Sequence, residues 1–185
     1  MKRKERQMDL MKRIIGIVLA CTMMLGLVAC GSSNSKEEAK EVSSSAKGYV
    51  FTNNNVDVAM DVKADDVIKA LGTDYKYFEA ASCAFDGLDK TYQYGSAFVV
   101  GTYPKDGVDY ISYVYLKDNT VSTKEGVKVG DTIDAMKKAY GDATADETGG
   151  YEYKKDNMSL KFITVDGTTI DEIDYSSNAT KTTTN

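Results

Sequence analysis

The chain has 185 residues, of which 28 are acidic and 23 basic, and it contains three cysteines but no histidine and no tryptophan. The net charge of −5 argues against nucleic acid and anionic lipid headgroups as partners, because proteins bind both through basic patches. The lack of histidine excludes the common Ser-His and Cys-His routes of hydrolysis and the histidine-containing zinc sites.

Residues 1–29 have the pattern of a secretory signal. Lys12 and Arg13 precede a charge-free run from Ile14 to Val28, and small residues surround Cys30. This run has about 15 residues, whereas a bilayer-spanning helix needs about 20, which favours a cleaved signal over an uncleaved anchor. The start codon can be Met1, Met8 or Met11, because the first residues add basic charge that a signal does not need.

The sequence Leu27-Val28-Ala29-Cys30 resembles the bacterial lipobox, in which the cysteine is acylated and becomes the mature N-terminus. The resemblance implies a palmitate-type lipid on Cys30 and an extracytoplasmic protein anchored to the cell membrane. Each buried CH₂ of such a lipid contributes about 0.8 kcal/mol, and stable anchoring takes about two acyl chains. Removal of residues 1–29 leaves 17 basic and 26 acidic residues, so the mature chain would carry a charge of −9.

The aromatic residues mark the boundaries of the folded domain. Every Phe and Tyr lies between Tyr49 and Tyr175, whereas the flanking segments are rich in Ser, Thr, Lys and Glu and cannot bury enough apolar surface to fold. We therefore expect an acylated Cys30 with a flexible tether over residues 30–47, an α+β domain over 48–176 and a disordered tail over 177–185. Cys83 is left without a cysteine partner, and we expect it to be a small buried hydrophobic residue.

The hydrophobic pattern predicts a small mixed fold. A hairpin is expected first, around Asn53-Asn54-Asn55, with strands over 49–51 and 56–60. A helix over 63–71 follows, then strands over 98–103 and 110–116 around a turn at Pro104–Gly107. A second helix over 129–141, with Asp131 as its N-cap, precedes strands over 151–153, 159–165 and 169–175.

The two halves of this pattern correspond to each other. A shift of about 59 residues relates Ile111 to Ile170 and Val114 to Ile173, and a shift of about 69 relates the two helices. We interpret this as two tandem αβββ repeats, about 48–118 and 119–176, which merge into one antiparallel sheet with short helices packed on one face. The first repeat would carry an extra segment over residues 75–89. The alternative is chance similarity in a tyrosine-rich chain.

Two stretches add a resemblance to known families. Val127–Ile133, continuing to Ala139–Asp142, resembles the helix entry of the β-lactamase-inhibitor-protein-like repeats and of related small outer-membrane assembly lipoproteins. Ser82–Tyr92 is similar to segments of uncharacterised clostridial-type surface lipoproteins. The first resemblance implies a short helix paired with a small antiparallel sheet, often in tandem.

Carboxylates are the candidates for chemistry in a chain without histidine. Pairs of them can act on sugars, and the groups Asp65 with Asp66, Asp86 with Asp89, and Asp171 with Glu172 and Asp174 are close in sequence. Acidic residues in the first turn of a helix more often complement its dipole, and those near glycine more often form turns. The sequence contains no EF-hand spacing and no phosphate-binding loop, so we expect no metal and no cofactor.

Tyrosines at strand spacing are the better candidates for a binding site. Residues two apart in a strand share a face, and tyrosine combines an apolar ring with a polar tip. The sequence thus predicts a non-enzymatic binding module for a protein, a peptide or a wall polymer, with a carboxylate-dependent enzyme acting on cell-wall glycans as the alternative. The predicted binding residues are Tyr113 and Tyr115, supported by Tyr92, Tyr94, Tyr151 and Tyr153. The alternative for these rings is packing between strands or under the loop that follows Tyr75.

Overall fold

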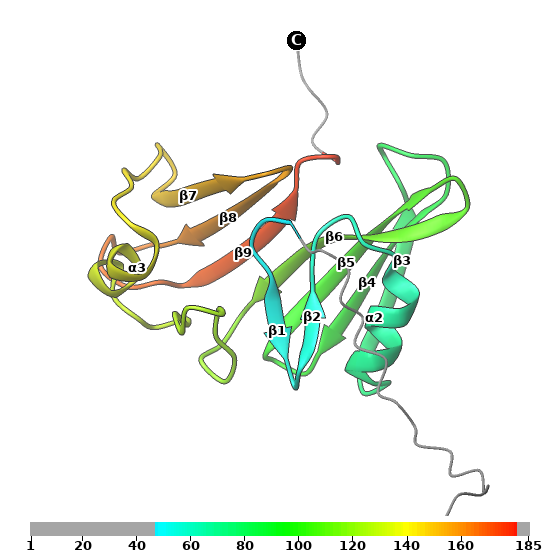
Figure 1. The fold of residues 1–185 in the computed structure, drawn as a ribbon, viewed down its shortest axis with the longest axis horizontal. Coiled ribbons are helices and arrows are strands. Elements are labelled where there is room, and N and C mark those ends of the chain that lie inside the picture. Colours follow the sequence, from blue (N-terminus) through cyan, green and yellow to red (C-terminus); the bar gives the residue numbers. More distant parts are fainter. Residues whose placement is uncertain (1–46, 181–185) are drawn as a thin grey trace, which may run out of the picture. The chain divides into compact units, whose positions relative to one another are not determined.

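A seven-stranded antiparallel sheet is the framework of the fold (Figure 1). The computed structural model describes residues 47–180, so the signal segment, Cys30 and nearly all of the tether lie outside the described residues, as do residues 181–185. The strand order is β3-β4-β5-β6-β9-β8-β7, and every neighbouring pair is antiparallel. In chain order the strands are β3 (Lys76–Ala81), β4 (Leu88–Tyr94), β5 (Phe98–Lys105), β6 (Val108–Leu116), β7 (Gly150–Lys155), β8 (Met158–Ile163) and β9 (Glu172–Ser177).

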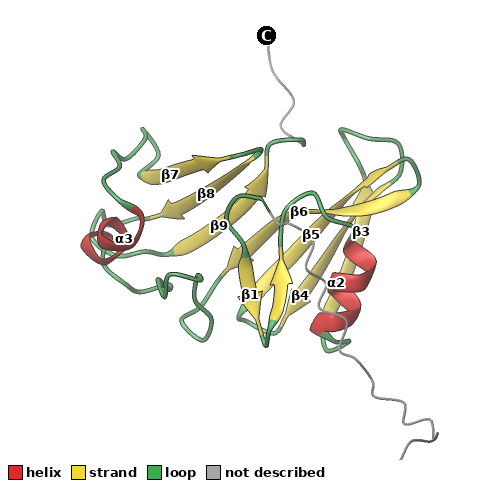
Figure 2. Ribbon diagram, in the orientation of Figure 1, coloured by secondary structure: helices red, strands yellow, loops and turns green. Residues whose placement is uncertain are grey.

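Two short helices and a hairpin complete the described fold, as Figure 2 shows by colour, and the predicted α+β class is confirmed. The helices are α2 (Ala64–Leu71) and α3 (Ile133–Tyr140). Each ends at a glycine with positive φ, 94° at Gly72 and 93° at Gly141, where a side chain would be strained. The N-cap of α3 is Thr132 rather than the predicted Asp131. The Thr132 hydroxyl accepts the Ala135 N–H at 3.2 Å, and Asp131 instead accepts the Lys128 N–H at 2.9 Å.

The predicted opening hairpin is confirmed, but its strands are β1 (Phe51–Asn53) and β2 (Val56–Val58) instead of the expected 49–51 and 56–60. Asn54 and Asn55 have φ values of 48° and 63°, the left-handed conformation that a two-residue hairpin turn requires and that Asn tolerates. The turn between β5 and β6 is built in the same way from Asp106 and Gly107. Pro104 therefore belongs to β5 and not to the turn.

One face of the sheet, here called the inner face, carries the core. Cross-strand pairing aligns Val100, Val114, Tyr175 and Leu160 in one row, and all four are buried. The hairpin lies over this face, where the ring of Phe51 is 5.1 Å from that of Phe98 (Figure 1). Both helices contribute to the same core through their apolar stripes: Ala64, Val67 and Ile68 from α2, and Ile133 and Met136 from α3.

The segment before each helix is bound to the sheet by the same pattern of hydrogen bonds. The Asp61 N–H donates to the Ile111 carbonyl, and the Ile111 N–H donates to Val62, both at 2.9 Å. The Gly130 N–H donates to Ile170 at 2.8 Å, and the Ile170 N–H donates to Asp131 at 2.9 Å. The residues before α2 are therefore hydrogen-bonded to β6, and those before α3 are hydrogen-bonded to the segment that leads into β9.

The side chain of Asp61 connects segments that are far apart in sequence. Its carboxylate accepts hydrogen bonds from the Tyr103 hydroxyl at 3.1 Å, the Ser177 hydroxyl at 2.5 Å and the Asn157 amide at 3.2 Å. These partners come from β5, from the end of β9 and from the turn between β7 and β8. Asp61 therefore connects β5, from the first half of the strand order, to β9 and the β7–β8 turn, from the second half.

The β6·β9 junction should be sensitive to loss of side-chain volume. Ile173 is 0% exposed on the inner face of β9, so Ile173→Ala should lower the free energy of unfolding by about 2–5 kcal/mol through lost burial and a residual cavity. The control Val165→Ala, at a residue 87% exposed, should change it by less than about 0.5 kcal/mol. Urea titrations followed by circular dichroism measure both, and an equal effect of the two substitutions would contradict this assignment of the core.

Candidate functional site

Tyr113 and Tyr115 lie side by side on the face of the sheet opposite the hairpin, here called the outer face. They occupy alternate positions of β6, and their rings stack with centroids 4.4 Å apart and planes 22° apart. Both are partly exposed. We call these two residues the tyrosine pair.

A glycine on the neighbouring strand supports the first ring. A Cβ atom at Gly101 would lie 2.0 Å from Cε1 of Tyr113, so the ring covers the bare backbone of β5. The Tyr113 hydroxyl then reaches the Thr91 hydroxyl on β4, with an oxygen–oxygen distance of 3.1 Å. Packing against a rigid strand and a hydrogen bond at its tip fix the position of this ring.

The second ring lies between an apolar and an acidic neighbour. Tyr115 is opposite Val99 on β5 and opposite Asp174 on β9. Burial raises the pKa of Tyr115 to about 12, and the negative charges of Asp174 and Glu172 also act to raise it. The phenol is therefore neutral at physiological pH and can donate a hydrogen bond.

The other four predicted tyrosines lie on the inner face, which corrects the prediction of a single tyrosine surface. Their cross-strand partners are Val100 for Tyr92, Phe98 for Tyr94, Phe162 for Tyr151 and Leu160 for Tyr153, all of which are core residues. Their rings pack accordingly, as in the stack of Tyr94 on Phe98 at 4.8 Å. Spacing by two residues shows that two side chains share a face, but not which face it is.

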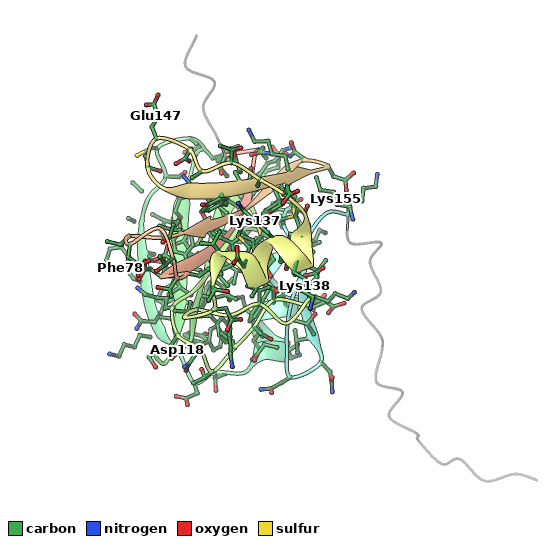
Figure 3. The ribbon with its side chains drawn as sticks, turned by 90° about the vertical axis from the view of Figure 1, so that its left-hand side faces the viewer. Phe78, Asp118, Lys137, Lys138, Glu147 and Lys155 are labelled. Atoms are coloured by element: carbon green, nitrogen blue, oxygen red, sulfur yellow. The ribbon has the colours of Figure 1, made fainter. Side chains whose placement is uncertain are left out.

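Phe78 is an aromatic residue of the outer face that the sequence did not single out. It lies on β3 and is 66% exposed, and the register aligns it in one row with Thr91, Gly101 and Tyr113. Figure 3 shows its side chain at the left of the view, on the side away from the hairpin. All six residues of β3 are exposed, so the alternation of apolar and polar residues that marks a half-buried strand is missing.

Cys83 is exposed, contrary to the prediction that it is buried. It lies in the loop between β3 and β4, which is closed by the Ser82 N–H donating to Gly87 at 3.0 Å. The Ser82 hydroxyl accepts the N–H groups of Ala84 and Phe85, both at 3.3 Å. The residue of this loop that packs is Phe85, whose ring stacks on Tyr103 at 4.9 Å.

The candidate carboxylates fall in three separate places. Asp65 and Asp66 are exposed in the first turn of α2, and Asp86 is exposed in the loop before β4. Asp171 accepts the Val165 N–H at 2.6 Å, which gives it a role in a turn. Glu172 and Asp174 occupy alternate positions of β9 and are the candidate acids nearest the tyrosine pair.

Within residues 47–180, no group of three or more His, Cys, Asp or Glu side chains is arranged to hold a metal ion. Over the same span, no helix is both long and apolar enough to cross a bilayer.

Comparison with known proteins finds a structural similarity but no match in sequence. No family model and no curated protein matches the sequence. Among solved structures, the chain is similar to the uncharacterized protein yfeY from Escherichia coli, with 16% sequence identity and a TM-score of 0.41. The alignment covers 71% of this chain and 97% of that chain. Similarity at this level supports no inference about family or function.

The buried tyrosines predict a loss of stability at alkaline pH. Burial raises the pKa values of Tyr94 and Tyr103 to about 12, against 10.0 for an ordinary tyrosine. As the pH rises from about 10 to about 12, the unfolded chain ionises first, so the folded state loses stability on the order of 3 kcal/mol for each residue. Below pH 10 these groups should have no effect on the pH dependence.

Urea unfolding at pH 9 and pH 11 measures this change, and Tyr94→Phe is the matched variant. The Tyr94 hydroxyl is buried and has no hydrogen-bond partner among the described residues, so its removal should preserve stability at pH 9. The variant should also lose less stability than the parent between the two pH values. Equal losses in both proteins would show that Tyr94 does not contribute.

Proposed function

We propose that this protein is a lipid-anchored extracytoplasmic binding module without enzymatic activity, which holds a protein, a peptide or a wall polymer on the outer face of its sheet. The tyrosine pair is the proposed anchor of that contact. Tyr92, Tyr94, Tyr151 and Tyr153 would support the fold of the module from the inner face instead of touching the partner.

The observation that carries this proposal is the fixed, partly exposed tyrosine pair. Stacking at 4.4 Å, contact with the Gly101 backbone and the hydrogen bond to Thr91 restrict the motion of the rings before any partner arrives. Binding then costs little side-chain entropy, which is the main expense of ordering an interface. Tyrosines held in this way are typical binding anchors because each offers a large apolar surface and a polar tip.

The charge of the surroundings restricts the partner. The mature chain would carry −9, and Asp174 and Glu172 flank the tyrosine pair on one side. A polyanionic partner would be repelled from this face, whereas a neutral or basic segment with apolar or ring-shaped groups would fit it. No nucleic acid is expected among the partners.

A carboxylate-dependent enzyme acting on cell-wall glycans is the second candidate. Glu172 and Asp174 favour it because they share a strand and lie beside Tyr115. Asp174→Asn distinguishes the two functions, since it would abolish glycan turnover but leave binding that depends on the rings largely intact.

We also propose that the domain consists of two αβββ repeats, α2-β4-β5-β6 and α3-β7-β8-β9, with β3 as an addition to the first. The register supports this reading. A shift of 59 residues relates Val114 to Ile173 and Leu116 to Tyr175. The cross-strand pair Val114–Tyr175 therefore corresponds to the pair Ile173–Leu116, as a two-fold axis between the repeats would require. The matching hydrogen bonds of Ile111 and Ile170 obey the same relation.

The proposed anchor can be tested at Cys30, which lies outside the described residues. The full chain, expressed in a bacterium fed labelled palmitate, should incorporate the label and partition with membranes. Cys30→Ser should abolish both properties because the acylated sulfur is lost, and stable anchoring needs about two acyl chains. The matched control is Cys21→Ser in the apolar run of the signal, which should keep the label. Labelling of Cys30→Ser would contradict the proposed site.

The proposed binding surface can be tested with the chain from Val42 to Asn185 as bait, since the described residues form their own core in this compact unit. The bait is exposed to envelope and secreted fractions. A partner held by the parent should be lost from Tyr113→Ala/Tyr115→Ala, with a fall in affinity of about tenfold or more. Gly101→Ala should also weaken capture, because its Cβ displaces the Tyr113 ring without removing it.

Tyr151→Ala is the control for the opposite face. This variant loses a tyrosine of the inner face, so capture should persist wherever circular dichroism shows a folded domain. Capture that survives the double substitution, or that is lost equally with Tyr151→Ala in folded protein, would contradict the assignment of the surface.

A further inference from the structure

The edge of the sheet formed by β3 is the most apolar exposed region among the described residues. Four large hydrophobic residues are strongly exposed among the described residues. Three of them lie on β3 or beside it on β4. Tyr77 is 48% and Phe78 is 66% exposed on β3, and Leu88, at 41%, is the β4 residue paired with Ala81. An edge strand also presents backbone groups that a further strand can pair with.

The opposite edge of the sheet is protected in the ways expected of a natural edge strand. β7 carries Glu152, Lys154 and Lys155, and an ion pair joins Lys154 to Glu152 at 3.1 Å. The Lys137 amine of α3 lies 5.4 Å from the centre of the Tyr151 ring. Like β7, β3 pairs with its neighbour in six consecutive pairs without a bulge or a proline, so it is straight enough to accept a partner strand. Unlike β7, it carries only Lys76 and Glu79 as charged residues and leaves Phe78 strongly exposed.

We infer that β3 pairs antiparallel with β3 of a second copy of this chain, across a two-fold axis perpendicular to the sheet. Such an axis preserves the two faces, so a residue must lie opposite a residue of the same face. Two registers satisfy this condition and align five residues of each strand. One is centred on Phe78 and the other on Glu79.

Charge decides between these registers. Centring on Glu79 places two carboxylates directly opposite each other, which is destabilising. Centring on Phe78 places the two Phe78 rings together, Tyr77 opposite Glu79 and Lys76 opposite Ala80. No like charges are then directly opposite, and the most exposed aromatic ring of the described surface is buried against its own copy. The strand is therefore complementary to itself in one register.

This pairing would place two tyrosine pairs on one continuous outer face, because the axis keeps both outer faces on the same side. The dimer does not depend on the proposed function, since β3 pairs through its edge while the tyrosine pair lies on β6. A failure of partner capture and a failure of dimerisation are thus separate results.

Sedimentation of the chain from Val42 to Asn185 over a range of concentrations tests the dimer. The parent should change from monomer to dimer as its concentration rises, and Phe78→Lys should raise the dissociation constant by about tenfold or more, since it replaces the central ring contact with two opposed ammonium groups. The matched control is Val165→Lys, which adds the same charge at a residue that is 87% exposed in the loop after β8, a strand at the other side of the sheet from β3. It should leave the dissociation constant within about twofold.

A charge exchange at the same position tests the register. Because residue 78 lies opposite itself, a mixture of Phe78→Lys with Phe78→Glu should associate more tightly than either variant alone. Circular dichroism checks the fold of each variant, which an exposed position should not disturb. A parent that stays monomeric near 1 mM, a Phe78→Lys variant that dimerises like the parent, or a mixture with no preference for mixed dimers would each overturn the inference.

Discussion

The pairing of β6 with β9 is the interaction on which the rest of the domain depends. It joins the strands of the first half of the chain to those of the second, opposing Val114 to Tyr175 and Leu116 to Ile173. All four side chains are at most 1% exposed, so the core runs through this junction without interruption. The two eight-residue helices are too short to be stable alone, and they acquire their order from this continuous inner face.

Elements with strong local signals were predictable from the sequence. The Asn-rich hairpin, both helices with their terminal glycines, and the strands β5 and β6 follow from turn chemistry and periodicity. The face of Tyr113 and Tyr115 was not predictable from alternation along β6, because a bulge at Ser112 interrupts the register between Gly101–Tyr113 and Thr102–Ile111. Strict alternation would put Ile111 and Tyr113 on one face, whereas the extra residue lets Ile111 enter the core while Tyr113 faces outward. Strand β3, with no buried residue, gives no periodic signal at all.

The candidate site illustrates how a small domain can offer a rigid surface on one face of its sheet. The inner face uses most of the large aliphatic residues, so the outer face is left with rings, hydroxyls and charges. Rigidity there comes from the sheet beneath: Gly101 allows the closest possible approach of Tyr113 to the backbone, and Thr91 holds the far end of the ring. Substituting either support would change the geometry of the surface while leaving its composition intact.

The place where the chain enters the domain has a mechanical consequence if the protein is held from its N-terminal side. Tension would arrive at Tyr49, whose N–H donates to the Met158 sulfur at 3.0 Å, and would pass next to β1. Within residues 47–180 that strand is paired only with β2, and Phe51 and Val58 form the first cross-strand pair at the open end of the hairpin. A force applied at this open end breaks the cross-strand pairs one after another instead of stretching all of them at once. The hairpin would therefore unfold before the seven-stranded sheet. Under such a force it would extend first, so the outer face of the sheet would keep its structure.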